Sequence, residues 1–458
     1  MTLLTMTKIT RTKKLFLTQF ATRFYFWMIC AMTLVTSVRA ELTLESTILQ
    51  TLKHSPELES NQYMELTRQL NERIAWSRYY PKISFEMLES HGFPGSAGAT
   101  TVTGLMISPF RTGVSAGFFV EDDLWDFGRT TGAIRVAEHE TNVSKKQGLV
   151  TALKISDVAQ QAYYLCSKDR TLAELTKKLV REASLIEKEV STFVRVGQTS
   201  VVEGVLSQSQ NEEARTLAES YQIQYELDNK RLGLLTGQAA NHPLCQSIDS
   251  MTYGSTHTQS SPPNAVSSSK ASPLLAQAEA QTAMYQAKRD LSLADFNPKL
   301  IGIGSVGYIQ NTELGIKPQN YSVAVGLIWP IFEGFKTSSE VKMLEAQTAQ
   351  AEKTRDATQF RIDDANLSFD RNIQANQVRV NHLKREFQLA ENGFQLAKKR
   401  YLAHQGDLGD LRETFRNLTR ISIELNESKY DLLTQIASQS LMNGHWNHLL
   451  SPPQKGGE

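Results

Sequence analysis

The chain carries one structural unit twice, and this duplication limits its possible folds more than any other feature. Ser55-Pro56 recurs as Ser272-Pro273, and Pro81-Lys82 recurs as Pro298-Lys299, both at an offset of 217 residues. The motif Leu124-Trp125-Asp126-Phe127-Gly128-Arg129 is echoed by Ile331-Phe332-Glu333-Gly334-Phe335-Lys336. Each copy predicts a helix, two strands, a long helix and a shorter helix in the same order. An internal repeat of this kind indicates one supersecondary unit built twice.

The first 40 residues have the pattern of an export signal. Five basic residues precede an apolar stretch over 24–35, and small residues follow up to Ala40. This order is typical of a cleaved signal peptide, whereas the alternative, a membrane anchor, needs about 20 apolar residues. Removing residues 1–40 changes the formal net charge from +1 to −5, because the segment holds six basic residues and no acidic one. A mildly acidic exported protein argues against a nucleic-acid partner.

Two cysteines, Cys166 and Cys245, remain after the signal. An oxidising compartment favours disulfides, so the two form a possible disulfide. Two separate thiols, one on a helix and one in a linker, are the alternative, because sequence does not show whether the sulfur atoms come close.

Proline marks where long helices can form. Residues 110–242 and 331–451 contain none, and proline breaks helix interiors. We expect long helices over 131–196 and 335–404, return helices over 200–235 and 408–443, and leading helices over 42–78 and 272–295. Apolar residues recur every seven positions, which predicts coiled-coil packing rather than a globular helical core. There are three such ladders: Val158, Leu165, Leu172, Leu179, Ile186 and Phe193; Ile373, Val380, Phe387, Phe394 and Tyr401; and Leu411, Leu418, Leu425 and Leu432. The first two ladders match when the sequence is shifted by 208 residues.

Four segments alternate between apolar and small or polar residues, at about 82–90, 112–124, 299–309 and 320–330. Each is close to the roughly 9–11 residues of a tilted transmembrane strand. Tyr321 and Trp329 begin and end the clearest alternation, where an aromatic interface girdle would lie. A pair of soluble hairpins is the alternative. Residues 238–271 are rich in Ser, Thr and Pro and read as a linker between repeats 41–237 and 272–444, while 445–458 read as a flexible tail.

The strand number constrains assembly. Four strands cannot close a membrane barrel, since the smallest single-chain barrels use about eight, and open strand edges cannot face lipid. If the strands span a membrane, several chains must combine them, and three copies supply twelve strands. The predicted fold is therefore mainly α with a small β part: duplicated coiled-coil helices forming an α-barrel, plus four transmembrane strands per chain closed as a 12-stranded barrel in a trimer.

The chain resembles the TolC-type outer-membrane factors, the exit ducts of Gram-negative efflux pumps and type I secretion systems. The resemblance covers nearly all of 42–444. Its most specific pieces are the two signatures Leu124-Trp125-Asp126-Phe127-Gly128-Arg129 and Trp329-Pro330-Ile331-Phe332-Glu333-Gly334. The turn Val196-Gly197-Gln198-Thr199-Ser200 and the close Leu235-Thr236-Gly237 also match.

The resemblance implies a homotrimer in outer-membrane lipid with a large periplasmic portion. It also implies docking with a periplasmic adaptor protein and an inner-membrane transporter, ABC-type or proton-driven. Tyr401, Glu203, Asp410 and Glu413 resemble the tyrosine and acidic residues that line the family's periplasmic constriction, where threefold symmetry would turn each carboxylate into a ring. The alternative is that these acids favour the positive starts of the return helices.

Two positions depart from the family pattern at this constriction. His404 stands where a gap-free match expects glycine, and Gly406 falls two residues later, where some members carry a basic gating partner. The departure weakens the expectation of a tyrosine–arginine latch.

The sequence contains no motif that indicates catalysis. There is no G-x-S-x-G, no phosphate-binding loop and no metal-ligand spacing, so we expect a protein that is not an enzyme, with no cofactor and no metal. A rod-like periplasmic coiled-coil adaptor or scaffold is the alternative function. It gives no reason for strands that alternate apolar residues with glycine and serine.

Overall fold

The computed structural model describes residues 41–90, 113–247, 272–311 and 319–444. The expected signal peptide (1–40), the tail (445–458) and most of the predicted linker (248–271) lie outside these residues. Thr43–Glu458 forms one structural unit, separate from Met1–Leu42.

The two repeats use the same order of elements. The first repeat contains α2 (Leu44–His54), α3 (Pro56–Trp76), the 3-10 turn η1 (Ser77–Tyr79), β1 (Lys82–Ser90), β2 (Gly113–Trp125), α4 (Arg129–Arg195) and α5 (Val201–Thr236). The second contains α6 (Pro273–Ala294), β3 (Lys299–Asn311), β4 (Gln319–Ile328), α7 (Lys336–Leu402) and α8 (Leu408–Met442).

The prediction of one leading helix over 42–78 is wrong, because α2 ends at His54 and α3 begins at Pro56. Ser55 between them has an extended backbone, and its hydroxyl accepts a hydrogen bond from the Leu58 amide at 3.4 Å. Proline suits the first position of a helix and disfavours helical geometry in the residue before it. The pair Ser55-Pro56 is therefore a helix start as well as a marker of the repeat.

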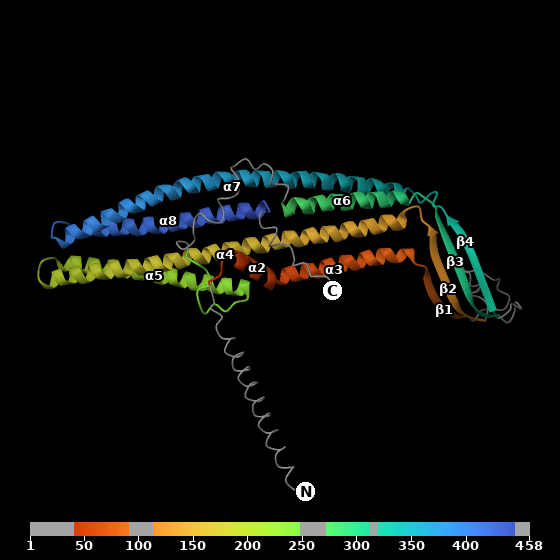
Figure 1. The fold of residues 1–458 in the computed structure, drawn as a ribbon, viewed down its shortest axis with the longest axis horizontal. Helices are drawn as coiled ribbons and strands as arrows, with labels where there is room; N and C mark the ends of the chain where they lie inside the picture. Colours follow the sequence, from red (N-terminus) through yellow and green to blue (C-terminus); the bar gives the residue numbers. More distant parts are fainter. Residues whose placement is uncertain (1–40, 91–112, 248–271, 312–318, 445–458) are drawn as a thin grey trace, which may run out of the picture. The chain divides into compact units, whose positions relative to one another are not determined.

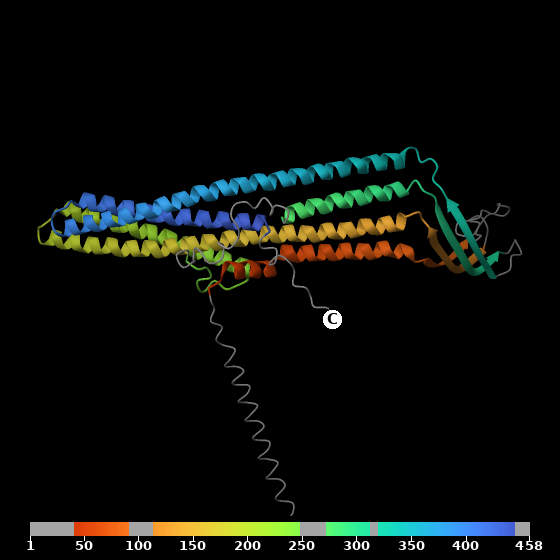
Figure 2. The same ribbon diagram turned by 45° about the horizontal axis from the view of Figure 1, so that its top comes forward.

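The long helices α4 and α7 run along the same direction, with the shorter helices α6 and α8 between them (Figures 1 and 2). Each has 67 residues, which corresponds to about 100 Å. In the half next to the sheet, α4 lies between α3 and α6, and α6 lies next to α7. In the other half, α4 packs against α5 and α8, and α8 packs against α7. Two short helices laid end to end thus accompany each long one.

The apolar ladders form the seams between these helices. Leu179 and Ile186 of α4 share one core cluster with Phe394 of α7 and with Leu411 and Leu418 of α8. The ends of α4 and α7 are related by 207 residues, whereas the ladders match at 208. The two offsets differ by one residue, which corresponds to about 100° of rotation around a helix.

The strands form one antiparallel sheet in the order β1-β2-β3-β4, at one end of the helices (Figure 1). The central pair, β2 and β3, joins the two repeats along eleven residues from Gly113 to Asp123, and then shifts register between Asp123 and Trp125. Strands β1 and β4 are the outer strands of this sheet. Among the described helices, none is long and apolar enough to cross a membrane.

Candidate functional site

One face of the sheet is apolar and exposed. The register aligns Phe85, Phe118, Val306 and Tyr321 across all four strands, and side chains two residues apart on a strand share a face. The large side chains exposed on this face are Ile83, Phe85, Met87, Phe118, Val306, Tyr308, Tyr321, Val323, Val325 and Leu327. A continuous apolar surface of this kind marks a contact with lipid or with another protein.

The opposite face carries small and polar side chains. Ser305 and Ser322 are paired across β3 and β4, with their hydroxyl oxygens 2.7 Å apart. Gly117 and Gly307 face each other across β2 and β3, and a Cβ added at Gly117 would lie 2.8 Å from the Gly307 Cα. The strands therefore have no room for a larger residue at this pair. This face also carries larger apolar side chains: Phe119, which is buried, Ile328, which is exposed, and Ile301 and Ile303, which are paired with Gly326 and Ala324.

Tyr321 and Trp329 lie near opposite ends of β4. Tyr321 belongs to the strand and is 84% exposed, whereas Trp329 follows the last strand residue, Ile328. The Trp329 indole donates a hydrogen bond to the Phe296 carbonyl at 3.1 Å, which ties the end of β4 to the segment between α6 and β3. Eight residues separate the two aromatics, which corresponds to about 26 Å along a strand.

Asp126 in the first repeat signature starts the helix α4. Its carboxylate accepts hydrogen bonds from the Gly128 amide at 3.0 Å and the Thr130 amide at 2.5 Å. Partial burial alone would raise the pKa of Asp126, but these hydrogen bonds outweigh it and hold the pKa below the usual value. In the second repeat, Glu333 takes the same place and accepts a hydrogen bond from the Thr337 hydroxyl at 2.9 Å. Both acids therefore satisfy groups at a helix start.

Arg129, the last residue of the first signature, connects the first repeat to the second by hydrogen bonds. Its guanidinium donates to the Asp295 carboxylate at 3.1 Å and to the carbonyl oxygens of Asp295, Asn297 and Pro298. These carbonyls follow the end of α6, where helical carbonyl groups lack partners.

The turns before α4 and α7 place their glycines differently. Phe127 and Gly128 both have left-handed backbones, with φ of 52° and 92°, and so do Gly334 and Phe335, with φ of 62° and 63°. Each repeat thus has one phenylalanine where glycine would fit without strain, at a cost of about 1–2 kcal/mol. Both phenyl rings are exposed, and each contacts the aromatic ring of its own signature, Trp125 or Phe332. We read these turns, together with Trp76, Tyr79, Tyr80 and Trp329, as an aromatic collar between sheet and helices.

At the far end of the helices, the structure brings together two of the predicted constriction residues. The Tyr401 hydroxyl donates a hydrogen bond to Glu203 Oε2 at 2.9 Å, and the Thr199 hydroxyl donates to the same oxygen. Burial, with the hydrogen bond to Glu203 and its charge, raises the pKa of Tyr401 to about 12. Tyr401 therefore remains a proton donor at physiological pH, and the bond joins the α4–α5 hairpin to the α7–α8 hairpin.

The other two predicted constriction residues lie apart from this bond. Asp410 and Glu413 are exposed on the first turns of α8, three residues apart and hence on one side of the helix. Gly406 lies in the turn before α8, where an added Cβ would be 3.1 Å from the Arg400 Cβ. Thr199 was not among the predicted site residues, although it lies inside the turn motif Val196-Gly197-Gln198-Thr199-Ser200.

The turns at the ends of α4 and α7 share one backbone geometry. Gly197 has φ of 71°, and His404, 207 residues later, has φ of 58°. In both turns the next amide reaches back to a helix carbonyl: Gln198 N to Phe193 O at 2.8 Å, and Gln405 N to Arg400 O at 2.9 Å. Histidine in the left-handed region is uncommon and costs about 1–2 kcal/mol relative to glycine.

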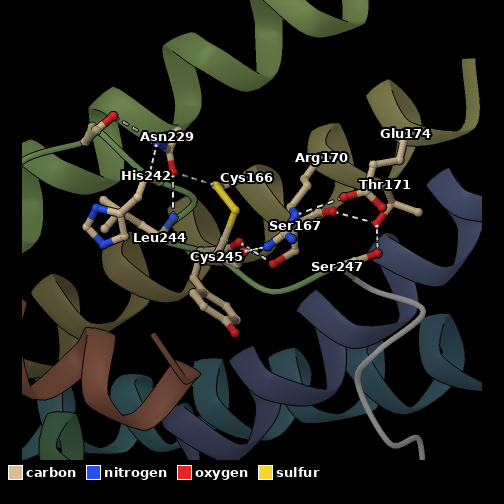
Figure 3. The surroundings of a disulfide bond; sticks show 12 residues. Cys166, Ser167, Arg170, Thr171, Glu174, Asn229, His242, Leu244, Cys245 and Ser247 are labelled. Atoms are coloured by element: carbon tan, nitrogen blue, oxygen red, sulfur yellow. Dashed lines mark hydrogen bonds and ion pairs between the residues drawn. A yellow bond between two sulfur atoms is a disulfide. The ribbon is translucent and has the colours of Figure 1, made fainter. Parts of the chain in front are cut away.

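Near the middle of α4, Cys166 and Cys245 are joined in a disulfide, with Cα atoms 6.1 Å apart (Figure 3). The bond holds residues 238–247 against α4 and α5. Arg170 donates to the Cys245 carbonyl, and Asn229 of α5 accepts from the Leu244 amide at 2.9 Å and donates to the His242 carbonyl at 3.0 Å. Both sulfur atoms belong to residues with 0% exposure.

A buried carboxyl group lies three residues further along α4. Asp169 is 3% exposed and lies 3.2 Å from the Lys168 ammonium. Burial, with the hydrogen bond that it shares with Asp228 of α5, raises the pKa of Asp169 to about 7. Lys168 also lies over the ring of Tyr430 on α8, at 5.3 Å from its centroid. Within the described residues, no group of three or more His, Cys, Asp or Glu side chains could hold a metal ion.

Comparisons with known proteins agree with this architecture. Residues 266–443, which include the second repeat, match the family model described as outer membrane efflux protein. The resemblance to TolC-type outer-membrane factors is thereby confirmed. No curated protein matches the chain.

Solved structures of outer-membrane proteins share the fold. The crystal structure of CusC has a TM-score of 0.75 at 14% identity, covering 88% of this chain and 92% of that one. The outer-membrane protein VceC from Vibrio cholerae has a TM-score of 0.73 at 15% identity, covering 88% and 96%. The open state of the MtrE outer-membrane channel of Neisseria gonorrhoeae has a TM-score of 0.72 at 14% identity, covering 88% of each chain. At these identities the likeness concerns the fold.

Proposed function

We propose that three copies of this chain form an outer-membrane channel-tunnel that exports small molecules or proteins from the periplasm to the cell exterior. The observation that carries the proposal is the apolar face of the sheet. Exposing these apolar side chains to water would cost roughly 25 cal/mol of free energy per Å² of apolar surface, whereas lipid is a favourable environment for them. The opposite face, with its serines and glycines, suits a water-filled interior.

The outer strands of the sheet support closure by other chains. Backbone groups at the edges of β1 and β4 need partners if the sheet lies in lipid. Pairing β4 of one chain with β1 of the next satisfies them, and three chains then close a twelve-stranded barrel. The aromatic collar would lie at the membrane–water interface on the periplasmic side, where tryptophan and tyrosine are favoured.

Helices at both sides of the chain also expose apolar residues. α3 exposes Leu66, Leu70 and Ile74, and α7 exposes Phe360 and Leu367. Joining α3 and α2 of one chain to α7 of the next would cover these side chains and continue the barrel into a helical tube. The scaffold alternative leaves both the helix surfaces and the sheet face unexplained.

In the proposed channel, the turns of the α4–α5 and α7–α8 hairpins would lie in the periplasm. There the Tyr401–Glu203 bond would hold the two hairpins of each chain together and keep the tube narrow. A periplasmic adaptor and an inner-membrane transporter, ABC-type or proton-driven, would dock at this end. The role is a conduit, so it requires no catalytic residues, cofactor or metal.

Adjacent residues on opposite faces of β4 provide a sharp test. Val323 is 86% exposed on the apolar face, and its neighbour Ala324 is exposed on the other. Lysine on a lipid-facing strand near the midplane costs about 2–4 kcal/mol, whereas lumen positions tolerate charge. V323K should therefore abolish outer-membrane insertion of a detergent-stable trimer, and A324K should preserve it.

Membrane fractionation followed by sizing in detergent measures both variants. Equal behaviour of V323K and A324K would contradict a lipid-facing sheet. Recovery of the unaltered protein as a soluble periplasmic monomer would contradict the channel and favour the scaffold.

Asp410 and Glu413 would form rings of carboxylates near the inner end of the tube, and such rings favour cations. The double variant D410A/E413A should therefore lose cation selectivity in single-channel recordings. A reversal potential identical to that of the unaltered channel would contradict the rings. The two acids would then only stabilise the positive N-terminal end of α8.

A further inference from the structure

His404 is the residue at the inner end whose presence the backbone does not explain. The same turn in the first repeat uses Gly197, and the two turns have matching φ angles and matching amide–carbonyl bonds. Glycine at position 404 would form this turn without strain. A strained residue that persists in a fold points to a function for its side chain.

The His404 side chain crosses from one hairpin to the other. Its ring centroid lies 4.7 Å from that of Phe193 on α4, with the planes tilted by 51°. Phe193 also lies 6.1 Å from the ring of Tyr401, the residue that bonds Glu203. The α7–α8 hairpin is thus held to the α4–α5 hairpin by a hydrogen bond and, beside it, by a ring contact.

A positive charge on the His404 imidazole would strengthen its contact with the Phe193 ring. Histidine changes its charge between pH 5 and 8, and a cation over an aromatic face is attracted by the ring's quadrupole. Other charged groups lie on each segment that meets here: Arg195 at the end of α4, Glu203 on α5, and Arg400, Asp407 and Asp410 on the α7–α8 hairpin. Among these residue types, histidine is the one that ordinarily gains a proton between pH 8 and pH 5.

We propose that His404 is a second clasp between the two hairpins of one chain, which tightens on protonation and acts beside the Tyr401–Glu203 bond. The proposal rests on the proposed function, because it supplies that channel with a pH-dependent closed state. A cation–aromatic contact at an exposed site favours the clasped form about two- to fivefold. The periplasmic end would therefore open more readily at neutral pH than in acid.

The test measures the distance between hairpins and so does not depend on conduction. Spin labels are placed on S191C of α4 and K399C of α7, both exposed positions. The protein used lacks the expected signal peptide and with it Cys30, while Cys166 and Cys245 remain bonded to each other. Labelled chains are diluted with unlabelled ones, so that each distance comes from one chain. Pulsed dipolar spectroscopy then compares pH 5.5 with pH 8.

We expect a narrow distance distribution at pH 5.5 and a fraction of separated hairpins that rises two- to fivefold at pH 8. H404F keeps a ring without a charge and should be insensitive to pH. H404G relaxes the backbone to that of Gly197, so it does not strain the turn. At both pH values it should give a fraction of separated hairpins at least as large as that of the unaltered chain at pH 8. Y401F removes the neighbouring hydrogen bond, and its distribution should still respond to pH.

An H404G distribution identical to that of the unaltered chain would overturn the clasp. An unaltered chain whose distribution does not change between the two pH values would overturn its proton dependence. If the channel proposal fails instead, single-channel conductance is absent while these distances behave as expected.

Discussion

The two long helices have the same length and very different surroundings. Of the 67 residues in α4, 26 are buried, whereas nine of the 67 residues in α7 are buried. α4 lies between two neighbours along its whole length, with α3 and α6 in one half and α5 and α8 in the other. α7 lies at one side of the chain, where α6 and α8 contact it.

In the proposed trimer, this difference locates the side of the chain that the next subunit would cover. The open side of α7 carries large apolar residues such as Phe360, Leu367 and Leu389, whose side chains are 70% exposed or more. A helix of a soluble monomer would place polar residues there. α4 therefore represents the finished wall of the proposed tube, and α7 represents a wall that needs the next subunit.

Matched leucine substitutions should show the largest difference between the two long helices. Leu172 of α4 is 0% exposed and Leu367 of α7 is 70% exposed. L172A should lower the free energy of unfolding by about 2–5 kcal/mol, because it leaves a cavity in the core. L367A should act on subunit association, so its effect on the melting temperature should depend on protein concentration. Circular dichroism in detergent at several concentrations checks both, and equal, concentration-independent losses would contradict the difference between the helices.

The disulfide should account for the next largest effect. It joins Cys166 in α4 to a residue 79 positions later, and no bond of this kind is present among the described residues of α7. Replacing both cysteines with serine should lower the free energy of unfolding by about 2–4 kcal/mol. Thermal unfolding of the double variant, compared with the untreated and the reduced parent protein, measures this. Unchanged melting in both cases would mean that the hydrogen bonds of Asn229 and Arg170 suffice to hold residues 238–247.

Asp169 provides a smaller, pH-dependent test. Its pKa is raised from 3.8 to about 7, so the folded state binds its proton more tightly than the unfolded state. Its contribution to stability is present below about pH 4 and is lost as the pH rises through about 7. The residue 207 positions later on α7 is Asn376, which donates to Gln435 at 3.1 Å.

The variant D169N makes α4 resemble α7 at this position. It should stabilise the protein by about 1–2 kcal/mol at pH 8, because no buried charge forms, and should have little effect at pH 4. Melting curves at the two pH values decide this. A variant that is less stable at pH 8 would show that the ionised pair with Lys168 stabilises the fold.

The sequence predicted the helices well because their signals are local. The absence of proline and the seven-residue ladders predicted 131–196 and 335–404, and α4 and α7 cover Arg129–Arg195 and Lys336–Leu402. The break at Ser55-Pro56 was missed even though both residues are local signals, because the pair was used only as a marker of the repeat. A serine followed by proline is itself a helix start.

Contacts between distant segments could not be predicted in the same way. The resemblance named Tyr401 and Glu203, but their hydrogen bond depends on how the two hairpins pack. The Arg129 contacts with the end of α6 and the ring contact of His404 with Phe193 also depend on that packing. The left-handed backbone of Phe127 and Phe335 was hidden, because glycine stands at only one of the two positions in each turn and at a different one in each repeat.

The most direct test of the whole account is a single-particle image of the purified protein in detergent, viewed along the long helices. We predict a ring of three chains around an open lumen, with α3 of each chain against α7 of the next. A single closed molecule with no lumen, in which the exposed face of α7 remains in contact with solvent, would contradict it.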